Sequence, residues 1–393
     1  METPPLSRAT TFTLRVRRGQ EHAEAQATVE ARYRNAFRIL RDAPIAQTTH
    51  LAAPLPDGRA ILMGGNTSET PNVPDSTLTQ VFDPATETFA RGPELLFSAA
   101  AHEFTSLVQL SNGGFLLVGG GINAGLGGRT SAATQMFDPA GARFVEVGDA
   151  VLTGISGRTS APLGDGGALL TGGFVSNRAE RYDPVEKKWR AVGNMLHVRG
   201  GHTATLLRDG RVLIAGGSTC CDQPAPSNLA YANTAEIYDP ATDAFSATGS
   251  MEVARGLHAA ALLPDGRVLI SGGEGNDPAA PPLGAEIFDP ATGRFSSAGN
   301  LLTPRDSHTA VTLTDGRVLV AGGEVPPLVA GSAGVGVPGT EIFDPATGRW
   351  TEGPTIDRDF LAATVTMLSN GKVLVFGGED RAGFPRANAA LFE

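Results

Sequence analysis

Cysteine is nearly absent from this chain of 393 residues, because the only two, Cys220 and Cys221, are adjacent. Neighbouring cysteines cannot join distant segments, so the sequence predicts no disulfide framework. Long apolar runs are also absent: Gly, Pro or a charged residue interrupts each run well before the roughly 18 residues that a membrane span needs. Residues 1–20 contain four arginines and no apolar segment typical of a secretory signal. We therefore expect a cytoplasmic protein with no membrane partner.

Positive charge is scarce as well. The chain has 31 Lys and Arg against 41 Asp and Glu, a net charge of −10. Binding to a nucleic-acid backbone needs a clustered positive surface, so no nucleic-acid partner is expected. Only three of the cations are lysines, a skew that we attribute to GC-rich, bacterial coding.

Glycine and proline, by contrast, are abundant, with 50 and 27 residues, and the glycines follow a repeat. Pairs of glycines end seven short apolar runs, at intervals of 44 to 56 residues. An Asp-Gly or Asn-Gly step precedes each pair, which predicts a hairpin with a type I′ turn, in which both central residues have positive φ. The first glycines of the pairs are Gly64, Gly119, Gly172, Gly216, Gly272, Gly322 and Gly377.

A second hairpin signal follows in the first six repeats. An aromatic residue precedes an Asp-Pro step, which suits a type I turn, and a second aromatic follows six residues after the Asp. Each repeat therefore predicts four antiparallel strands, a to d. The aromatic pairs are Phe82 and Phe89, Phe137 and Phe144, Tyr182 and Trp189, Tyr238 and Phe245, Phe288 and Phe295, and Phe343 and Trp350.

These landmarks resemble the Kelch repeat, within the galactose oxidase-like superfamily of propellers, over residues 35–393. The resemblance implies an all-β, seven-bladed propeller of four-stranded antiparallel blades, preceded by an extension over residues 1–34. The last repeat ends at Glu393 without a strand d, so we expect residues 35–40 to supply that strand and close the ring. In the extension, residues 11–17 alternate like a strand, which predicts either an extra edge strand or docking arm, or a disordered leader.

The connections between strands b and c are long and variable, and they emerge on one face of a propeller. Binding sites usually lie on such loops, so a site is expected on this face, over the central channel. The longest loop, residues 218–234, contains the adjacent cysteines and Tyr231, a candidate binding residue. The cysteines could form a vicinal disulfide, bind a soft metal or remain plain thiols, and we favour plain thiols.

The position 14 residues before each glycine pair begins the innermost strand. Its occupants, in blade order, are His50, Thr105, Arg158, His202, His258, His308 and Ala363. The four histidines could bind a divalent transition metal at the channel mouth. Alternatively, and in our preferred interpretation, each His forms hydrogen bonds between neighbouring blades. Arginines stand three residues earlier in three blades and favour an anionic ligand: Arg199, Arg255 and Arg305.

Carboxylates follow the glycine pairs of the last three blades. They are Glu274, Glu324, Glu379 and Asp380. Together with His258 and His308, Glu274 and Glu324 could hold a divalent cation or act as catalytic acid and base. Salt bridges to Arg255 and Arg305 are the interpretation that we favour.

Departures from the repeat are further candidates for function. His102 lies in an extended segment of blade two, Arg158 replaces the His of blade three, and residues 357–360 precede Ala363. Each could reshape the channel mouth or belong to a solvated loop between blades.

The resemblance to galactose oxidase would imply copper, bound by Tyr and His ligands that include a Tyr cross-linked to Cys. The chain has only four tyrosines, and Tyr182 and Tyr238 already serve as strand-c aromatics, so the match to this site is poor. Two functions remain open. The first is a monomeric propeller that binds a small-molecule ligand, such as an anionic molecule or a carbohydrate, or a protein partner. The second is an enzyme, either metal-dependent or acid/base, acting as an oxidase, isomerase or cyclase.

Overall fold

The computed structural model describes fifteen segments of the chain. They are residues 10–18, 21–29, 35–41, 43, 45–47, 50–65, 77–97, 105–119, 133–150, 157–218, 230–277, 281–325, 335–356, 363–378 and 386–393. These segments form strands β1 to β32 and no helix. Accordingly, no helix in the described segments is long and apolar enough to cross a membrane.

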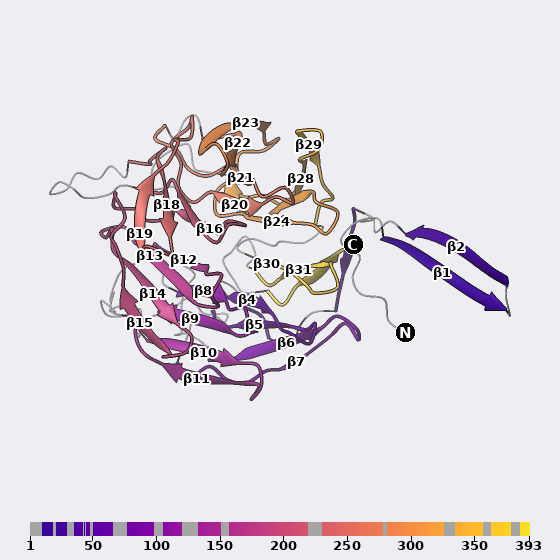
Figure 1. The fold of residues 1–393 in the computed structure, drawn as a ribbon. Coiled ribbons are helices and arrows are strands. Elements are labelled where there is room, and N and C mark those ends of the chain that lie inside the picture. Colours follow the sequence, from indigo (N-terminus) through magenta and orange to yellow (C-terminus); the bar gives the residue numbers. More distant parts are fainter. Residues whose placement is uncertain are drawn as a thin grey trace.

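Seven four-stranded antiparallel sheets surround a common centre, so the protein is a seven-bladed β-propeller (Figure 1). Each innermost strand lies beside that of a neighbouring blade, and β30 contacts both β24 and β4, which closes the ring. Blades 1 to 3 comprise β4 Leu51–Pro54, β5 Ala60–Met63, β6 Thr79–Asp83 and β7 Thr88–Arg91; β8 Thr105–Gln109, β9 Phe115–Gly119, β10 Thr134–Asp138 and β11 Arg143–Val147; and β12 Arg158–Pro162, β13 Ala168–Gly172, β14 Ala179–Asp183 and β15 Lys188–Ala191.

The other four blades follow the same order. They comprise β16 Thr203–Leu206, β17 Val212–Ala215, β18 Ala235–Asp239 and β19 Ala244–Ala247; β20 Ala259–Leu262, β21 Val268–Ser271, β22 Gly284–Asp289 and β23 Arg294–Asn300; β24 Thr309–Thr312, β25 Val318–Ala321, β28 Glu341–Asp344 and β29 Arg349–Glu352; and β30 Thr364–Met367, β31 Val373–Phe376, β32 Ala389–Phe392 and β3 Phe37–Ile39. In blade 6 a short ribbon of β26 Glu324–Val325 and β27 Val335–Gly336 stands between strands b and c.

The a-to-b turns correct one detail of the prediction. The glycine of each Asp-Gly or Asn-Gly step has positive φ, but the preceding Asp or Asn does not. In blade 1, Gly58 N–H donates to Leu55 O and Leu55 N–H donates to Arg59 O. This is a type I turn followed by a left-handed glycine, a three-residue connection, and not the type I′ turn that we predicted.

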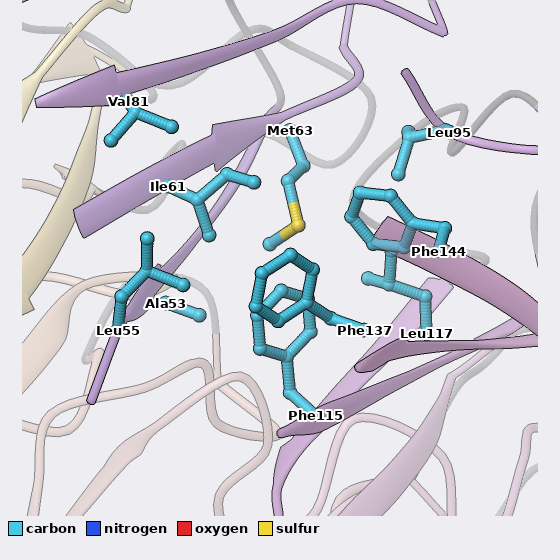
Figure 2. Close-up of a cluster of buried hydrophobic side chains, with 10 residues drawn as sticks. All are labelled: Ala53, Leu55, Ile61, Met63, Val81, Leu95, Phe115, Leu117, Phe137 and Phe144. Atoms are coloured by element: carbon cyan, nitrogen blue, oxygen red, sulfur yellow. The ribbon is translucent and has the colours of Figure 1, made fainter. Parts of the chain in front are cut away.

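The hydrophobic core lies between the blades. Strand b of every blade is buried along its whole length, because neighbouring blades cover both of its faces. Figure 2 shows one such seam, where Ile61 and Met63 of blade 1 face Phe115 and Phe137 of blade 2. The predicted aromatic pairs lie directly opposite one another on strands c and d, as in Phe137 and Phe144, whose ring centroids are 5.4 Å apart.

The ring closes as predicted, through the N-terminal strand. β3 pairs antiparallel with β32, and Phe37 lies opposite Phe392 with ring centroids 5.4 Å apart. Arg38 adds ion pairs to Glu393 and to Glu87 of blade 1. The last sheet is therefore built from both ends of the described chain.

The segment before β3 contains a separate hairpin. β1 Thr10–Arg18 and β2 Glu21–Val29 pair only with each other in the sheet assignment, and Figure 1 shows them beside the propeller. The alternating segment is therefore one strand of this hairpin, and the sheet that it forms contains no strand of a propeller blade. A docking role for it stays a prediction.

Candidate functional site

The four histidines of the repeat lie in the seams between blades. His202 Nε2 is 2.8 Å from Thr171 Oγ1 of blade 3, and His308 Nε2 is 3.0 Å from Ser271 Oγ of blade 5. His258 Nε2 is likewise 3.0 Å from Thr203 Oγ1 of blade 4. The rings of His202, His258 and His308 therefore each join their own blade to the preceding one, which is the interpretation that we favoured for the repeat histidines.

The glycine pairs make room for these rings. A Cβ added to Gly172, Gly216 or Gly272 would lie within 2.8 Å of Cε1 of the His from the next blade. Gly322 has nothing within 4 Å of the same point, and the next blade carries Ala363 in place of His. The glycine and the His of the repeat are thus two halves of one packing contact.

Burial makes the rings poor proton carriers at neutral pH. Burial, together with the nearby positive charge of Arg199 or Arg305, lowers the pKa of His202 and of His308 to about 3. Burial followed by the charge of Arg255 also places the pKa of His258 well below its ordinary value. These side chains are therefore neutral in the folded protein.

The three arginines are occupied inside their own blades. Arg199, Arg255 and Arg305 are at most 1% exposed. Each forms an ion pair of 2.9–3.0 Å with a glutamate of strand c, and each donates to the carbonyl of the first glycine of its pair. Those partners are Glu236, Glu286 and Glu341.

These contacts correct the predicted salt bridges. Arg255 pairs with Glu286 and Arg305 pairs with Glu341, not with Glu274 and Glu324. An anionic ligand would have to displace a buried carboxylate to reach either guanidinium, so we do not assign these arginines a ligand. In blade 1 the same place holds an uncharged pair, in which Gln80 Nε2 donates to Gln47 Oε1 at 2.7 Å.

Arg158 lies at the start of β12, where other blades carry His. Burial lowers its pKa, and the charge of Glu180 on β14 opposes that shift. Its predicted binding role stays a prediction.

Asp306 is the residue that the sequence analysis missed. It follows Arg305 in the stretch Arg-Asp-Ser-His, whereas blades 4 and 5 have Arg-Gly-Gly-His and Arg-Gly-Leu-His. The glycines at this position lie under an aromatic ring, since a Cβ on Gly256 would be 2.6 Å from the ring of Tyr231. Comparing the residue after each repeat Arg would have singled out Asp306, but we aligned the repeats on Arg and His alone.

The side chain of Asp306 belongs to a carboxyl cluster on the b-to-c face. We use the name carboxyl cluster for Glu274, Asp306 and Glu324 together with Tyr231. The Tyr231 hydroxyl donates to Glu274 Oε2. The backbones of Asp306 and Glu324 are bridged by two hydrogen bonds of 3.0 and 3.1 Å, and those of Gly256 and Glu274 by two of 3.0 and 2.8 Å. The cluster therefore joins blades 4, 5 and 6.

The Asp306 carboxyl is buried and incompletely paired. It is 1% exposed, and its Oδ2 has no hydrogen-bond partner among the described residues. Burial and the charges of Glu274 and Glu324, opposed by a hydrogen bond from Ser307, raise its pKa to about 7. Burial and the charge of Glu274 also raise the pKa of Glu324. Asp306 therefore changes charge near neutral pH.

The backbone beside the cluster is tightly held. Gly201, Leu257 and Ser307 occupy equivalent positions in blades 4 to 6, and all three have positive φ. Leu257 N–H donates to Gly201 O, and Ser307 N–H donates to Leu257 O. Positive φ is costly for leucine, and such strain is often found at functional sites.

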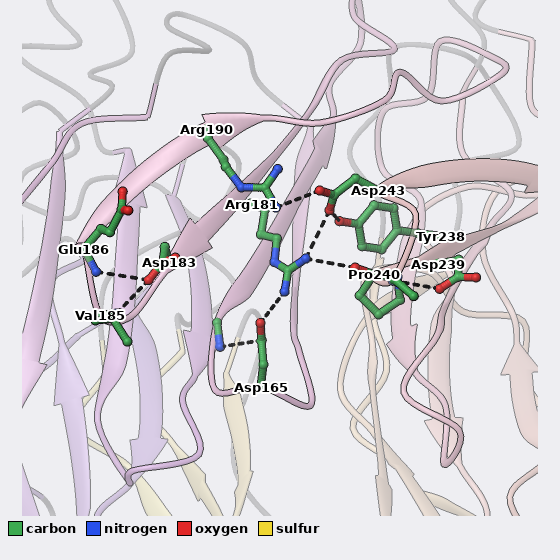
Figure 3. A network of polar contacts seen from close by, with 12 residues as sticks. Asp165, Arg181, Asp183, Val185, Glu186, Arg190, Tyr238, Asp239, Pro240 and Asp243 are labelled. Atoms are coloured by element: carbon green, nitrogen blue, oxygen red, sulfur yellow. Dashed lines mark hydrogen bonds and ion pairs between the residues drawn. The ribbon is translucent and has the colours of Figure 1, made fainter.

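The opposite face carries charges of a different kind. In Figure 3, Arg181 of β14 donates to Asp243 and Pro240 of blade 4 and pairs with Asp165. Asp243 also accepts from Tyr238 and pairs with Arg190. Although burial acts to raise the pKa of Asp243, these donors hold it below its ordinary value. In this network, which joins blades 3 and 4, two arginines face two aspartates, whereas no ion pair from a described residue reaches the carboxyl cluster.

Several predicted residues lie outside the described segments. These are Glu379 and Asp380, His102, residues 357–360, and the adjacent Cys220 and Cys221. Their roles stay predictions.

A copper centre does not fit the described side chains. Tyr182 and Tyr238 are completely buried among core aromatics, and Tyr231 donates to Glu274. The His rings of blades 4 to 6 use Nε2 for the contacts between blades. Within the described segments no three His, Cys, Asp or Glu side chains gather as a metal site would require. Metal binding by the four histidines stays a prediction without support from these contacts.

The fold defines the class as a seven-bladed β-propeller, and the comparisons with known proteins add a likeness of fold. No protein-family model matches the chain, and no curated protein matches it, so membership of the Kelch family stays a prediction. One similar solved structure is described as a novel fungal alcohol oxidase with catalytic diversity among the AA5 family, in complex with copper. Its TM-score is 0.68 at 15% identity, and the match covers 91% of this chain and 75% of that chain.

Proposed function

We propose that the protein binds a small, hydroxyl-bearing molecule on its b-to-c face, at the carboxyl cluster over blades 4 to 6. Asp306 carries this proposal. A buried carboxyl with an unpaired oxygen is destabilising, and the repeat offers glycine at the same position without that cost. Keeping the carboxyl is explained if a ligand displaces the groups that cover it and completes its hydrogen bonds.

The carboxyl cluster suits a hydroxyl-bearing ligand because it presents hydrogen-bond acceptors. Carboxylate oxygens accept hydrogen bonds from hydroxyl groups. Tyr231 supplies an aromatic wall beside them, and two hydrogen bonds with Asn276 fix its backbone. Asn276 accepts from the backbone N–H of Tyr231 at 2.7 Å and donates to its carbonyl at 3.1 Å. A preformed wall lowers the ordering cost of binding.

The test is calorimetric titration with a panel of neutral, cationic and anionic monosaccharides and sugar alcohols. The wild type is compared with Asp306→Asn and with Glu186→Gln, which removes an exposed carboxylate from a c-to-d turn on the opposite face. We expect at least one compound to bind the wild type and Glu186→Gln alike and to lose tenfold or more in affinity with Asp306→Asn. Equal binding by all three proteins, or no binding by any, would overturn the proposal.

A second candidate function is acid/base catalysis on the bound molecule, by an isomerase or cyclase. A pKa of about 7 for Asp306 favours this function, because a group half-protonated at neutral pH can both give and accept a proton. Exchange between the anomers of a bound reducing sugar, followed by NMR, tests this role. Acceleration that follows one ionisation near pH 7 and disappears in Asp306→Asn supports catalysis, whereas binding without acceleration leaves the binding function alone.

Oxidase chemistry is suggested only by the copper-bound neighbour, and we give a divalent transition metal no role in the proposal. The donor set described above does not supply a copper centre, and a likeness at 15% identity speaks for the fold.

A further inference from the structure

The carboxyl cluster has no cationic partner among the residues that the structure describes. In the described part of the chain, neither Arg nor Lys forms an ion pair with Glu274, Asp306 or Glu324. Arg255 and Arg305, which precede the innermost strands of blades 5 and 6, are committed to Glu286 and Glu341. The site therefore keeps a negative potential, in a protein whose net charge is −10, and an anionic ligand is disfavoured.

The hydrogen-bond inventory points the same way. The Tyr231 hydroxyl already donates to Glu274, while Asp306 Oδ2 has no donor among the described residues. When Asp306 is ionised, all three carboxylates are acceptors only. A ligand that fits must therefore bring N–H or O–H donors, and a positive charge would strengthen each of those bonds.

A bare metal ion fits less well than an organic cation. The described carboxylates and imidazoles do not gather into a set of three ligands around one point. A protonated primary amine does not require such a shell, because a hydrogen bond to one carboxylate holds it and the neighbouring carboxylates add their negative charge. It can also lie beside an aromatic ring such as that of Tyr231, which packs over Gly256.

From these observations we infer that the ligand of the b-to-c face is a hydroxylated primary amine of the amino-sugar class, with its ammonium group bound to Asp306 and stabilised by the charges of Glu274 and Glu324. The inference rests on the proposed function and names the substrate class of the same site. It reverses the expectation from the arginines, which favoured an anionic ligand.

Binding of the amine should be linked to proton release. The groups that face Asp306 are Glu274 of blade 5, Glu324 of β26 and Tyr231 of blade 4, and the charges of the two glutamates favour the neutral acid. An ammonium ion favours the ionised carboxylate, so binding drives off the proton. Affinity should therefore rise as the pH increases from 5.5 to 7, by up to about tenfold per pH unit.

The experiment uses three matched probes at pH 7: glucosamine, N-acetylglucosamine and glucuronate. They share a pyranose ring and differ in carrying a positive charge, a neutral amide or a negative charge. We expect glucosamine to bind at least tenfold more tightly than either of the others. Asp306→Asn should lose that preference and the rise with pH, and Glu186→Gln should keep both.

The outcomes separate the two claims. Equal or tighter binding of N-acetylglucosamine or glucuronate, with sensitivity to Asp306→Asn, would overturn the amine inference and leave the proposed binding function standing. Absence of binding by all three probes, in an otherwise folded protein, would overturn the inference. If the wider panel also fails to bind, the proposed function falls with it. A thermal-unfolding midpoint for Asp306→Asn at or above that of the wild type shows that a loss of binding is not a loss of folding.

Discussion

At the residue scale, backbone conformation separates scaffold positions from site positions. Seven non-glycine residues in the described segments have positive φ. Four of them, Glu87, Ala142, Lys187 and Asp243, end the c-to-d turns of blades 1 to 4, where blades 5 and 6 carry glycine. Positive φ costs an L-residue about 1–2 kcal/mol. Glu87 and Asp243 use their side chains in ion pairs with Arg38 and Arg181, whereas Ala142 has only a methyl group at the same turn position.

Ala142→Gly should therefore stabilise the protein, by about 0.5–1 kcal/mol. The reverse change, Gly348→Ala, should destabilise it by about 1 kcal/mol through the backbone alone, because φ is +68° and nothing lies within 4 Å of the added Cβ. Denaturant unfolding measures both changes. If both variants changed the free energy of unfolding in the same direction, strain in the turn would not be what distinguishes these positions.

The repeat predicted many single residues correctly but missed the one that matters most. Aromatic pairs, glycine pairs and interblade histidines recur because each blade needs the same packing, so their spacing shows in the sequence. Asp306 occurs in one blade only, and its burial depends on neighbours from blades 5 and 6 that lie far away in sequence. The salt bridges of Arg255 and Arg305 were also mispredicted. Their partners are glutamates of strand c, which carry no landmark of the repeat.

At the scale of the element, each of blades 4 to 6 is tied together by one buried ion pair between the loop before strand a and strand c. In addition to the Arg, the carboxylate accepts backbone N–H groups, as Glu341 does from Leu302 and Thr303. The Gln47 and Gln80 pair shows that a neutral version fits the same architecture in blade 1.

Arg305→Gln alone should cost about 3–5 kcal/mol of unfolding free energy, because it leaves the Glu341 carboxylate buried without its partner. Adding Glu341→Gln should recover much of that loss by recreating the pair found in blade 1. A double-mutant cycle of urea unfolding tests this. If the losses of unfolding free energy in the two single variants simply added in the double variant, a Gln–Gln pair would not replace the ion pair.

The hairpins that build each blade were predicted well, with the exception of their turn type. Pro56 and Pro264 stand before Asp in two of the a-to-b turns. Proline sets a φ of about −65°, which suits the second position of a type I turn and excludes positive φ there. The signal was therefore present, but the Asp-Gly step alone favoured the other turn.

At the scale of the whole molecule, the seams between blades make stability depend on pH. The folded-state pKa of His202 and of His308 is about 3, below the ordinary value of 6.5, and that of His258 is shifted in the same direction. The unfolded chain therefore takes up protons first as the pH falls, and stability present above pH 6.5 is lost progressively toward pH 3.

Each of these histidines should reduce the unfolding free energy by up to about 1.4 kcal/mol per pH unit below 6.5. Urea unfolding at pH 7, 6 and 5 measures the slope. His308→Gln, which keeps a polar side chain near Ser271 Oγ, should lower the slope although it weakens the seam. An unchanged slope in this variant would show that the ring is protonated as readily in the folded state as in the unfolded chain.

Ring closure predicts a sharp boundary for N-terminal truncation. Deleting residues 1–34 removes the β1–β2 hairpin and leaves β3. The propeller should therefore stay folded and keep nearly the same thermal-unfolding midpoint as the full chain. Deleting residues 1–45 also removes β3 and the bond from Leu40 N–H to Ala389 O, and the open ring should be strongly destabilised or aggregate through β32. Thermal unfolding and gel filtration compare the two proteins, and equal stability would refute closure by β3.

The measurement that most directly tests the central claim is the unfolding free energy of Asp306→Asn relative to the wild type from pH 5 to 8.5. A carboxyl whose folded pKa is raised to about 7 contributes stability that is lost as the pH rises through 7. The asparagine variant lacks this loss. The difference between its unfolding free energy and that of the wild type should therefore grow with pH and level off above 8, toward a limit of about 4 kcal/mol. An advantage that does not change with pH would contradict a buried, uncompensated carboxyl, and with it the site proposed on the b-to-c face.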